Sequence, residues 1–156
     1  MKRKIFLFFL LSLGAMQGRA QLLVDAEYNT SSGKIDVTFK NMSDSLTFIF
    51  CGERMPVPDA EMSYIELENG ETLYPEICRC SLLPGDLFFL HPGEQWKLGY
   101  PVLTDSFVRA FLLEISYWRA NMPKEEWGKP VDYKMKNWRK YTLPRKSRVN
   151  LLRIIK

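Results

Sequence analysis

The stretch Lys34-Ile35-Asp36-Val37-Thr38-Phe39-Lys40 decides the fold class, because apolar and polar residues alternate through it. Such alternation is typical of a β-strand that buries one face. Turn-forming residues lie on both sides, Asn29-Thr30-Ser31-Ser32-Gly33 before the stretch and Asn41-Met42-Ser43-Asp44-Ser45 after it. The sequence therefore predicts a strand between two turns.

The same pattern of short apolar or alternating runs between turns recurs along the chain. Further strands are expected at residues 22–28, 46–50, 64–67, 72–74, 87–90, 95–100 and 147–155. Residues 107–118 fit a helix face or a strand, and we interpret them as a strand because they are rich in aromatic and β-branched residues. Short strands with regular turns favour an all-β, antiparallel β-sandwich, with an up-and-down β-barrel as the alternative.

Asn69-Gly70 lies between two strand-like runs and predicts a β-hairpin. A two-residue turn there would place Leu67 opposite Thr72 and Ile65 opposite Tyr74. The same turn would place Glu68 opposite Glu71, and facing like charges are unfavourable. The loop could therefore open to four residues, which would leave the other pairs unchanged.

Residues 121–144 are expected to be a long excursion from the sheets. Pro123, Gly128 and Pro130 should interrupt regular structure there, apart from one short helical turn at Lys124-Glu125-Glu126-Trp127. Acidic residues in the first turn of such a helix interact favourably with its dipole.

The order of motifs in residues 35–118 resembles small bacterial secreted immunoglobulin-like domains. The residues that carry the resemblance are an Asn-x-Ser turn at 41–43, the Asn-Gly hairpin at 69–70 and the Pro-Gly-Glu turn at 92–94. The resemblance implies a fold and brings no catalytic residues with it. The Cys-Trp-Cys order of antibody domains is absent, because Trp96 follows all three cysteines.

The first 20 residues have the three parts of a secretory signal peptide. Met1-Lys2-Arg3-Lys4 is cationic, residues 5–13 are apolar, and Gly18-Arg19-Ala20 places small residues before a cleavage point. We expect cleavage after Ala20, so that residues 21–156 form a single domain that is secreted, periplasmic or on the cell surface. An uncleaved anchor is the alternative, and the apolar run is short for one, because a span needs about 20 apolar residues. No later stretch is apolar enough to cross a membrane.

Charge is distributed unevenly in the expected mature chain. Residues 21–133 carry nine cations and all 18 acids, whereas residues 134–156 carry nine cations and no acid. This basic segment could lie against the acidic body and neutralise it, in which case we expect its side chains near carboxylates such as Glu66, Glu68 or Glu71. Alternatively, it could bind an anionic ligand outside the cytoplasm.

The sequence indicates no catalytic set, no metal site and no cofactor. Cys51, Cys78 and Cys80 are candidates for one disulfide, since exported chains meet oxidising conditions. Cys51 would pair with Cys78 or Cys80 and leave one thiol over. His91, the single histidine, lies in a His-Pro-Gly turn and is expected to be packed or solvated there rather than catalytic.

Two functions remain open. The first is a non-enzymatic interaction module that binds another protein, through an edge strand for example. The second is a carbohydrate- or anionic-glycan-binding module that uses aromatic rings and nearby cations. Its candidate residues are Trp127, Trp138, Lys136, Arg139, Lys140, Arg145, Lys146 and Arg148. Export makes nucleic acid an unsuitable partner. Exposed, coplanar aromatic rings would favour glycans, and buried ones would favour a protein partner.

Overall fold

The computed structural model describes residues 21–52, 55–56, 58–59, 62–74 and 87–155. These residues form an antiparallel sandwich of two sheets, and the sheets do not close into a barrel. The first sheet has the strand order β1-β2-β7. Its strands are β1 (Leu22–Asn29), β2 (Lys34–Asn41) and β7 (Gln95–Pro101). The predicted fold class is confirmed.

The second sheet has the order β5-β4-β8-β3-β6, with β9 on the other side of β8. Its strands are β3 (Thr47–Cys51), β4 (Tyr64–Leu67), β5 (Thr72–Leu73), β6 (Leu87–Leu90), β8 (Val108–Ala120) and β9 (Thr142–Ile154). One edge of β8 pairs with β9, and the other pairs first with β4 and then with β3. The ambiguous segment 107–118 is therefore a strand, as predicted.

Between its pairings with β4 and β3, β8 finds other hydrogen-bond partners. The N–H of Glu114 donates to Ser63 Oγ at 2.9 Å, and the carbonyl of Glu114 accepts from the N–H of Asp59 at 2.7 Å. Buried backbone groups need such partners, because an unmet one is costly. The buried Ser63 hydroxyl thus replaces a missing ladder bond.

The main core lies between the sheets and is rich in aromatic rings. Ile35, Val37 and Phe39 of β2 are fully buried, which confirms the predicted alternation. Phe39 and Phe50 meet edge to face across the two sheets, with ring centroids 5.2 Å apart. This geometry is a preferred one for aromatic pairs, so the rings add directional contacts to the burial of apolar area.

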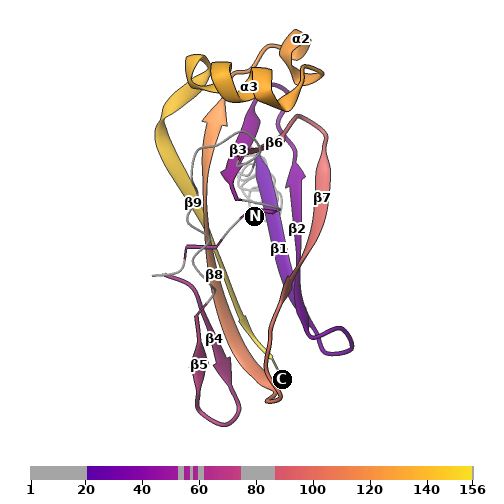
Figure 1. Ribbon diagram of the computed structural model, residues 1–156, viewed down its shortest axis with the longest axis vertical. Helices are drawn as coiled ribbons and strands as arrows, with labels where there is room; N and C mark the ends of the chain where they lie inside the picture. Colours follow the sequence, from indigo (N-terminus) through magenta and orange to yellow (C-terminus); the bar gives the residue numbers. More distant parts are fainter. Residues whose placement is uncertain (1–20, 53–54, 57, 60–61, 75–86, 156) are drawn as a thin grey trace, which may run out of the picture.

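The strands β3 and β6 are apolar without alternation because both of their faces are covered. Phe48 and Phe50 point into the main core, whereas Ile49 belongs to a second apolar cluster. That cluster lies beneath the helical cap, which consists of α2 (Lys124–Trp127), α3 (Val131–Asn137) and the 3-10 turn η1 (Trp138–Lys140). Figure 1 shows α2 and α3 lying across one end of the sandwich, far from the β4–β5 hairpin.

The helical cap contains more regular structure than we predicted. The expected turn at residues 124–127 is α2, but α3 follows directly after Pro130. Pro123 and Pro130 precede the first residues of these helices, where their missing N–H groups are not needed. The prolines that we interpreted as interruptions therefore mark where the two helices begin.

The predicted register of the β4–β5 hairpin was wrong by one residue. Ile65 pairs with Leu73, and the N–H of Leu67 donates to the carbonyl of Glu71 at 2.9 Å. Among the described residues only glycines have positive φ, so Asn69 cannot adopt the two-residue turn, which needs positive φ at both positions. The loop consists of residues 68–70, and within it only Gly70 has a positive φ, of +86°. In this loop Glu68 does not lie opposite Glu71.

Asn41 joins three connections at the capped end of the sandwich. Its buried side-chain amide donates to the carbonyl of Leu46 at 2.7 Å and to that of Leu90 at 2.9 Å. Its side-chain oxygen accepts from the N–H of Ser43 at 2.9 Å, and its own N–H donates to the carbonyl of Glu94 at 3.0 Å. The predicted turn at residues 41–45 is thereby tied to the ends of β3 and β6.

Candidate functional site: the outer edge of β9 and the helical cap

β9 is longer than predicted, because it begins at Thr142 rather than near residue 147. It pairs with β8 on one side, and no described strand pairs with its other side. The N–H of Ile155 donates to the carbonyl of Arg109, so these two residues are a hydrogen-bonded pair of the ladder between β8 and β9. Hydrogen-bonded and non-hydrogen-bonded pairs alternate along such a ladder. In an antiparallel ladder the odd-numbered residues of β9 then bond to β8, and the even-numbered ones direct their N–H and C=O groups to the outer edge.

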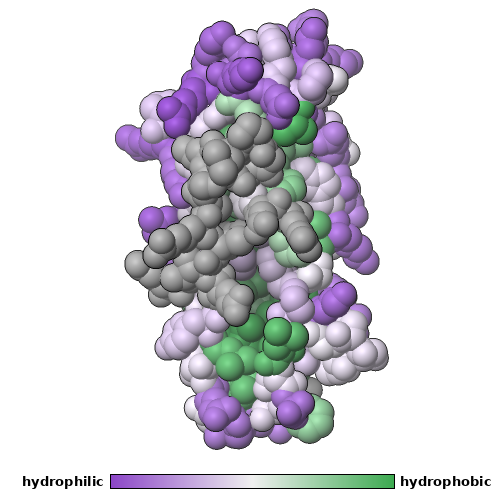
Figure 2. Space-filling model, viewed as in Figure 1, coloured by the Kyte–Doolittle hydropathy of each residue, from purple (hydrophilic) through white to green (hydrophobic). Residues whose placement is uncertain are grey.

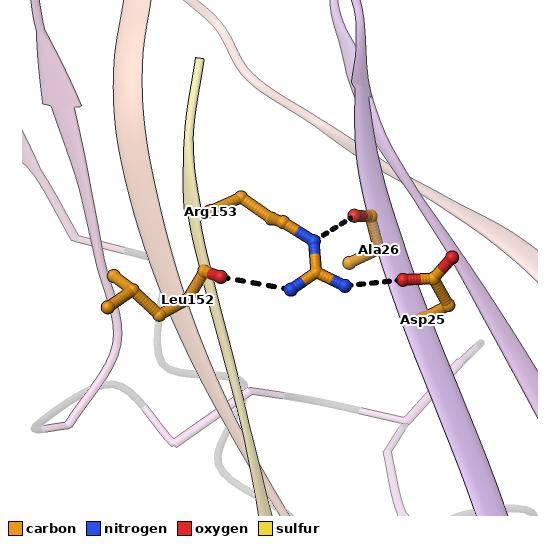
Figure 3. A network of polar contacts seen from close by, with 4 residues as sticks. All are labelled: Asp25, Ala26, Leu152 and Arg153. Carbon is orange, nitrogen blue, oxygen red and sulfur yellow. Dashed lines mark hydrogen bonds and ion pairs between the residues drawn. The ribbon is translucent and has the colours of Figure 1, made fainter.

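Arg153 bounds this outer edge at its C-terminal end. Its guanidinium donates from Nε to the carbonyl of Ala26 in β1 at 3.1 Å and from Nη2 to Asp25 Oδ1 (Figure 3). Its Nη1 donates to the carbonyl of Leu152 at 3.0 Å. One side chain therefore bridges the two sheets and satisfies an outward carbonyl of each edge strand.

The other end of the outer edge is bounded by an irregularity. The register between β8 and β9 shifts between Trp118, which pairs with Lys146, and Ala120, which pairs with Thr142. Pro144 lies within the shifted part and has no N–H to offer to another strand. Bulges and prolines are devices that stop unwanted strand pairing at sheet edges. The stretch of β9 with a regular outer edge is therefore Lys146–Leu152.

The side chains along this stretch change from cationic to apolar. Lys146 Nζ lies 4.8 Å from the centre of the Trp118 ring, and Arg148 Nη1 lies 3.4 Å from Glu114 Oε1. Leu152 and Ile154 follow on the same face, with 53% and 74% of their surfaces exposed. Figure 2 shows that apolar residues gather in the lower part of the face drawn there.

The remaining predicted cations belong to the helical cap or to the start of β9. Arg139 lies over the ring of Trp138 at 5.6 Å, and Lys140 Nζ donates to Asn137 Oδ1 at 2.6 Å. Lys136 and Arg145 are exposed. Of the six predicted cations, only Arg148 forms an ion pair with a carboxylate in the described part of the chain.

The carboxylates that pair with the basic segment are not those we expected. Arg148 pairs with Glu114 and Arg153 with Asp25, whereas Glu66 pairs with Arg109 at 3.3 Å. The side chain of Glu114 is only 5% exposed. Such a buried charge needs a partner, because removing it from water is costly. Part of the basic segment thus neutralises the body, whereas Lys136, Arg139 and Lys140 of the cap are exposed.

The predicted aromatic residues lie mainly in the interior. Trp138 is 7% exposed and meets Trp118 edge to face, with ring centroids 5.4 Å apart. Trp127 is half-buried, and its Nε1 donates to the carbonyl of Met122 at 3.0 Å. These rings attach the helical cap to the outer face of the second sheet, and they do not form an exposed row.

His91 is at the centre of a polar cluster that sequence reasoning missed. Its Nδ1 lies 3.0 Å from Thr47 Oγ1, and its Nε2 lies 3.4 Å from Nζ of Lys134 in α3. The ring of His91 stacks on Trp127 with centroids 5.4 Å apart, and the backbone N–H of His91 donates to Glu94 Oε2 at 2.7 Å. No sequence signal joins His91 to Lys134, because α3 itself was not predicted.

Burial lowers the pKa of His91 to about 4, and the charge of Lys134 adds to the effect while Glu94 opposes it. Burial also lowers the pKa of Lys134, again opposed by Glu94. His91 is therefore neutral at neutral pH and can accept a hydrogen bond from the Lys134 ammonium. His91 is thus packed at its turn, which is one of the two arrangements expected for it.

Comparisons with family models, with curated proteins and with solved structures gave no match to this chain. The resemblance to immunoglobulin-like domains therefore stays a prediction. Within the described residues, no helix is long and apolar enough to cross a membrane. Cys78 and Cys80 lie outside the described residues, so the disulfide with Cys51 also stays a prediction.

Proposed function

We propose that this chain is an exported, non-enzymatic module that binds another protein by adding a strand of that partner to β9. The observation that supports the proposal is the outer edge of β9, which pairs with no described strand. Exposed Leu152 and Ile154 lie on the same strand. An exposed edge with apolar side chains pairs readily with another chain, and many binding domains use this property.

The environment of the aromatic rings favours a protein partner over a glycan. Sugar rings need exposed aromatic faces, and Trp138 is buried while Trp127 stacks on His91. The environment of His91 favours a structural role for the histidine. Both of its ring nitrogens have neighbours within the fold, and 5% of its surface is exposed.

The test compares proteins retained by the immobilised chain from the exported fraction of its native host. Asn150→Pro removes an outward N–H from β9. Lys97→Pro is the control and removes an outward N–H from β7. Because the N–H of Val102 donates to the carbonyl of Gly33, the even-numbered residues of β7 bond to β2 and Lys97 faces outward. We expect a protein that the wild type and Lys97→Pro retain and Asn150→Pro does not. Equal retention by Asn150→Pro, or no retained protein, would overturn the proposal.

Export carries its own prediction. The protein recovered from an expressing cell should begin at Gln21 and contain one disulfide from Cys51 to Cys78 or Cys80. Intact-mass measurement and non-reducing peptide mapping check the two points. A membrane-bound form that retains Met1 would contradict the first, and three free thiols would contradict the second.

A further inference from the structure

The outward backbone groups of Lys146–Leu152 form a short template for one added strand. Lys146, Arg148 and Asn150 each direct an N–H and a C=O to the outer edge, and so does the N–H of Leu152. The carbonyl of Leu152 is already bonded to Arg153. The register shift near Pro144 ends the template on the other side. A seven-residue segment fits between these limits.

The cationic side chains beside the template favour an added strand that carries acidic residues. Lys146 is exposed and its ammonium lies over Trp118, where it has no carboxylate partner among the described residues. Arg148 is paired with Glu114, but its side chain is 61% exposed, so its guanidinium can donate to a second carboxylate. Opposite charges that face each other across neighbouring strands stabilise the pairing.

A second copy of the chain is a poor occupant. β9 contains no Asp or Glu from Thr142 to Ile154, so no register of β9 against β9 gives Lys146 or Arg148 an acidic residue opposite. Most such registers place cations opposite cations or opposite apolar residues, and both arrangements are unfavourable.

We propose that β9 binds an extended acidic segment of a partner protein as an antiparallel strand along Lys146–Leu152. This inference rests on the proposed function and names the chemistry of the partner. Acidic residues of the segment lie opposite Lys146 and Arg148, and an apolar residue lies opposite Leu152. Antiparallel pairing continues the pattern of the sheet, in which every described pair of strands is antiparallel, and it is slightly more stable per residue than parallel pairing.

The probe is a fluorescent peptide, Val-Thr-Thr-Thr-Glu-Thr-Glu, whose valine is designed to meet Leu152 and whose last glutamate is designed to meet Lys146. Its reversed sequence has the same composition and charge and serves as the control. We expect anisotropy titrations to show that the reversed peptide binds the exported protein about fivefold more weakly. Salt should weaken binding of the designed peptide, because the attraction is between exposed charges.

Lys146→Glu tests the register. It should weaken binding of the designed peptide about tenfold, since an attraction becomes a repulsion. A peptide that ends in lysine instead of glutamate should restore binding to this variant and bind the wild type poorly. Asn150→Pro should weaken binding of the designed peptide when it is made in the wild type, and binding of the lysine peptide when it is made in Lys146→Glu. The folded state of each variant is checked by circular dichroism.

Three results would overturn the inference. The first is equal binding of the designed and reversed peptides, the second is no restoration by the lysine peptide, and the third is a dimer of the protein alone that Asn150→Pro abolishes. If the peptides fail while an exported protein is still retained through β9, the acidic chemistry is wrong and the proposed function stands. If retention also fails, both are wrong.

Discussion

At the scale of single residues, buried polar side chains hold the capped end of the sandwich together. Asn41 links the ends of β2, β3 and β6 by hydrogen bonds, and His91 links β6 to the helical cap. Hydrogen bonds in such buried places contribute modestly when made and cost more when one partner is removed. Substitution of either residue should therefore show in the stability of the whole domain.

Asn41→Ala should lower the free energy of unfolding by about 2–4 kcal/mol, because the buried carbonyl of Leu90 and the partly buried carbonyl of Leu46 lose their donor. Asn69→Ala is the matched control, since its amide bonds to Glu71 and Ser106 are exposed, and it should cost less than about 1 kcal/mol. Urea unfolding measures both values. Equal losses in the two variants would contradict the role of Asn41.

His91 should make stability depend on pH. In the folded protein its pKa is about 4, against 6.5 for an unperturbed histidine, so the unfolded chain binds more protons between these values. Stability then rises with pH through this window and falls by up to about 3 kcal/mol as the pH drops from 6.5 to 4.

His91→Gln removes the titrating ring and serves as the control for that dependence. Its free energy of unfolding should fall less steeply over the same range of pH, with the shared carboxylates contributing equally to both proteins. Urea unfolding at a series of pH values gives the two curves. Parallel curves would show that His91 does not titrate with a lowered pKa.

At the scale of elements, most strands could be predicted from the pattern of residues. The alternation at residues 34–40 indicates a strand with one buried face. The unbroken apolar runs of β3 and β6 indicate strands with two buried faces, and the helical cap covers the second of these faces. α3 was missed because Pro130 indicates a break as readily as a helix start. The hairpin register was missed because Asn69-Gly70 is compatible with several turns, and local φ angles select among them.

Gly70→Ala should destabilise the hairpin, because Gly70 has φ +86° and an added Cβ has nothing within 4 Å to clash with. Backbone strain is then the only new cost, about 1–2 kcal/mol. Gly128→Ala is the matched control, since its φ of −79° suits alanine and its surroundings are equally open. Thermal unfolding should show a loss for Gly70→Ala alone. A similar loss in both would contradict this explanation.

At the scale of the whole molecule, the basic segment contains cations that pair with acids of the body and cations that remain exposed. Arg148 and Arg153 neutralise acids of the body, while Lys136, Lys140 and Arg145 remain on the surface. The sequence shows this asymmetry of charge but cannot show which cations pair with acids of the body. That choice depends on the pairing of β8 with β9 and on the approach of β1 to β9, which are contacts between residues far apart in the chain.

Arg153 closes the side of the sandwich where β1 and β9 approach each other. Arg153→Met keeps much of the apolar stem but removes the bonds to Ala26 and Asp25, and it should lower the free energy of unfolding by about 1–2 kcal/mol. Arg109→Met removes an exposed ion pair with Glu66 within one sheet and should cost less than about 0.5 kcal/mol. Urea unfolding compares the two losses. Amide hydrogen exchange should also quicken in β1 and the end of β9 for Arg153→Met only, because Arg153 joins strands of different sheets, whereas Arg109 and Glu66 lie in the same sheet. An exchange pattern that is the same in both variants would mean that packing of the main core, rather than Arg153, holds the two edges together.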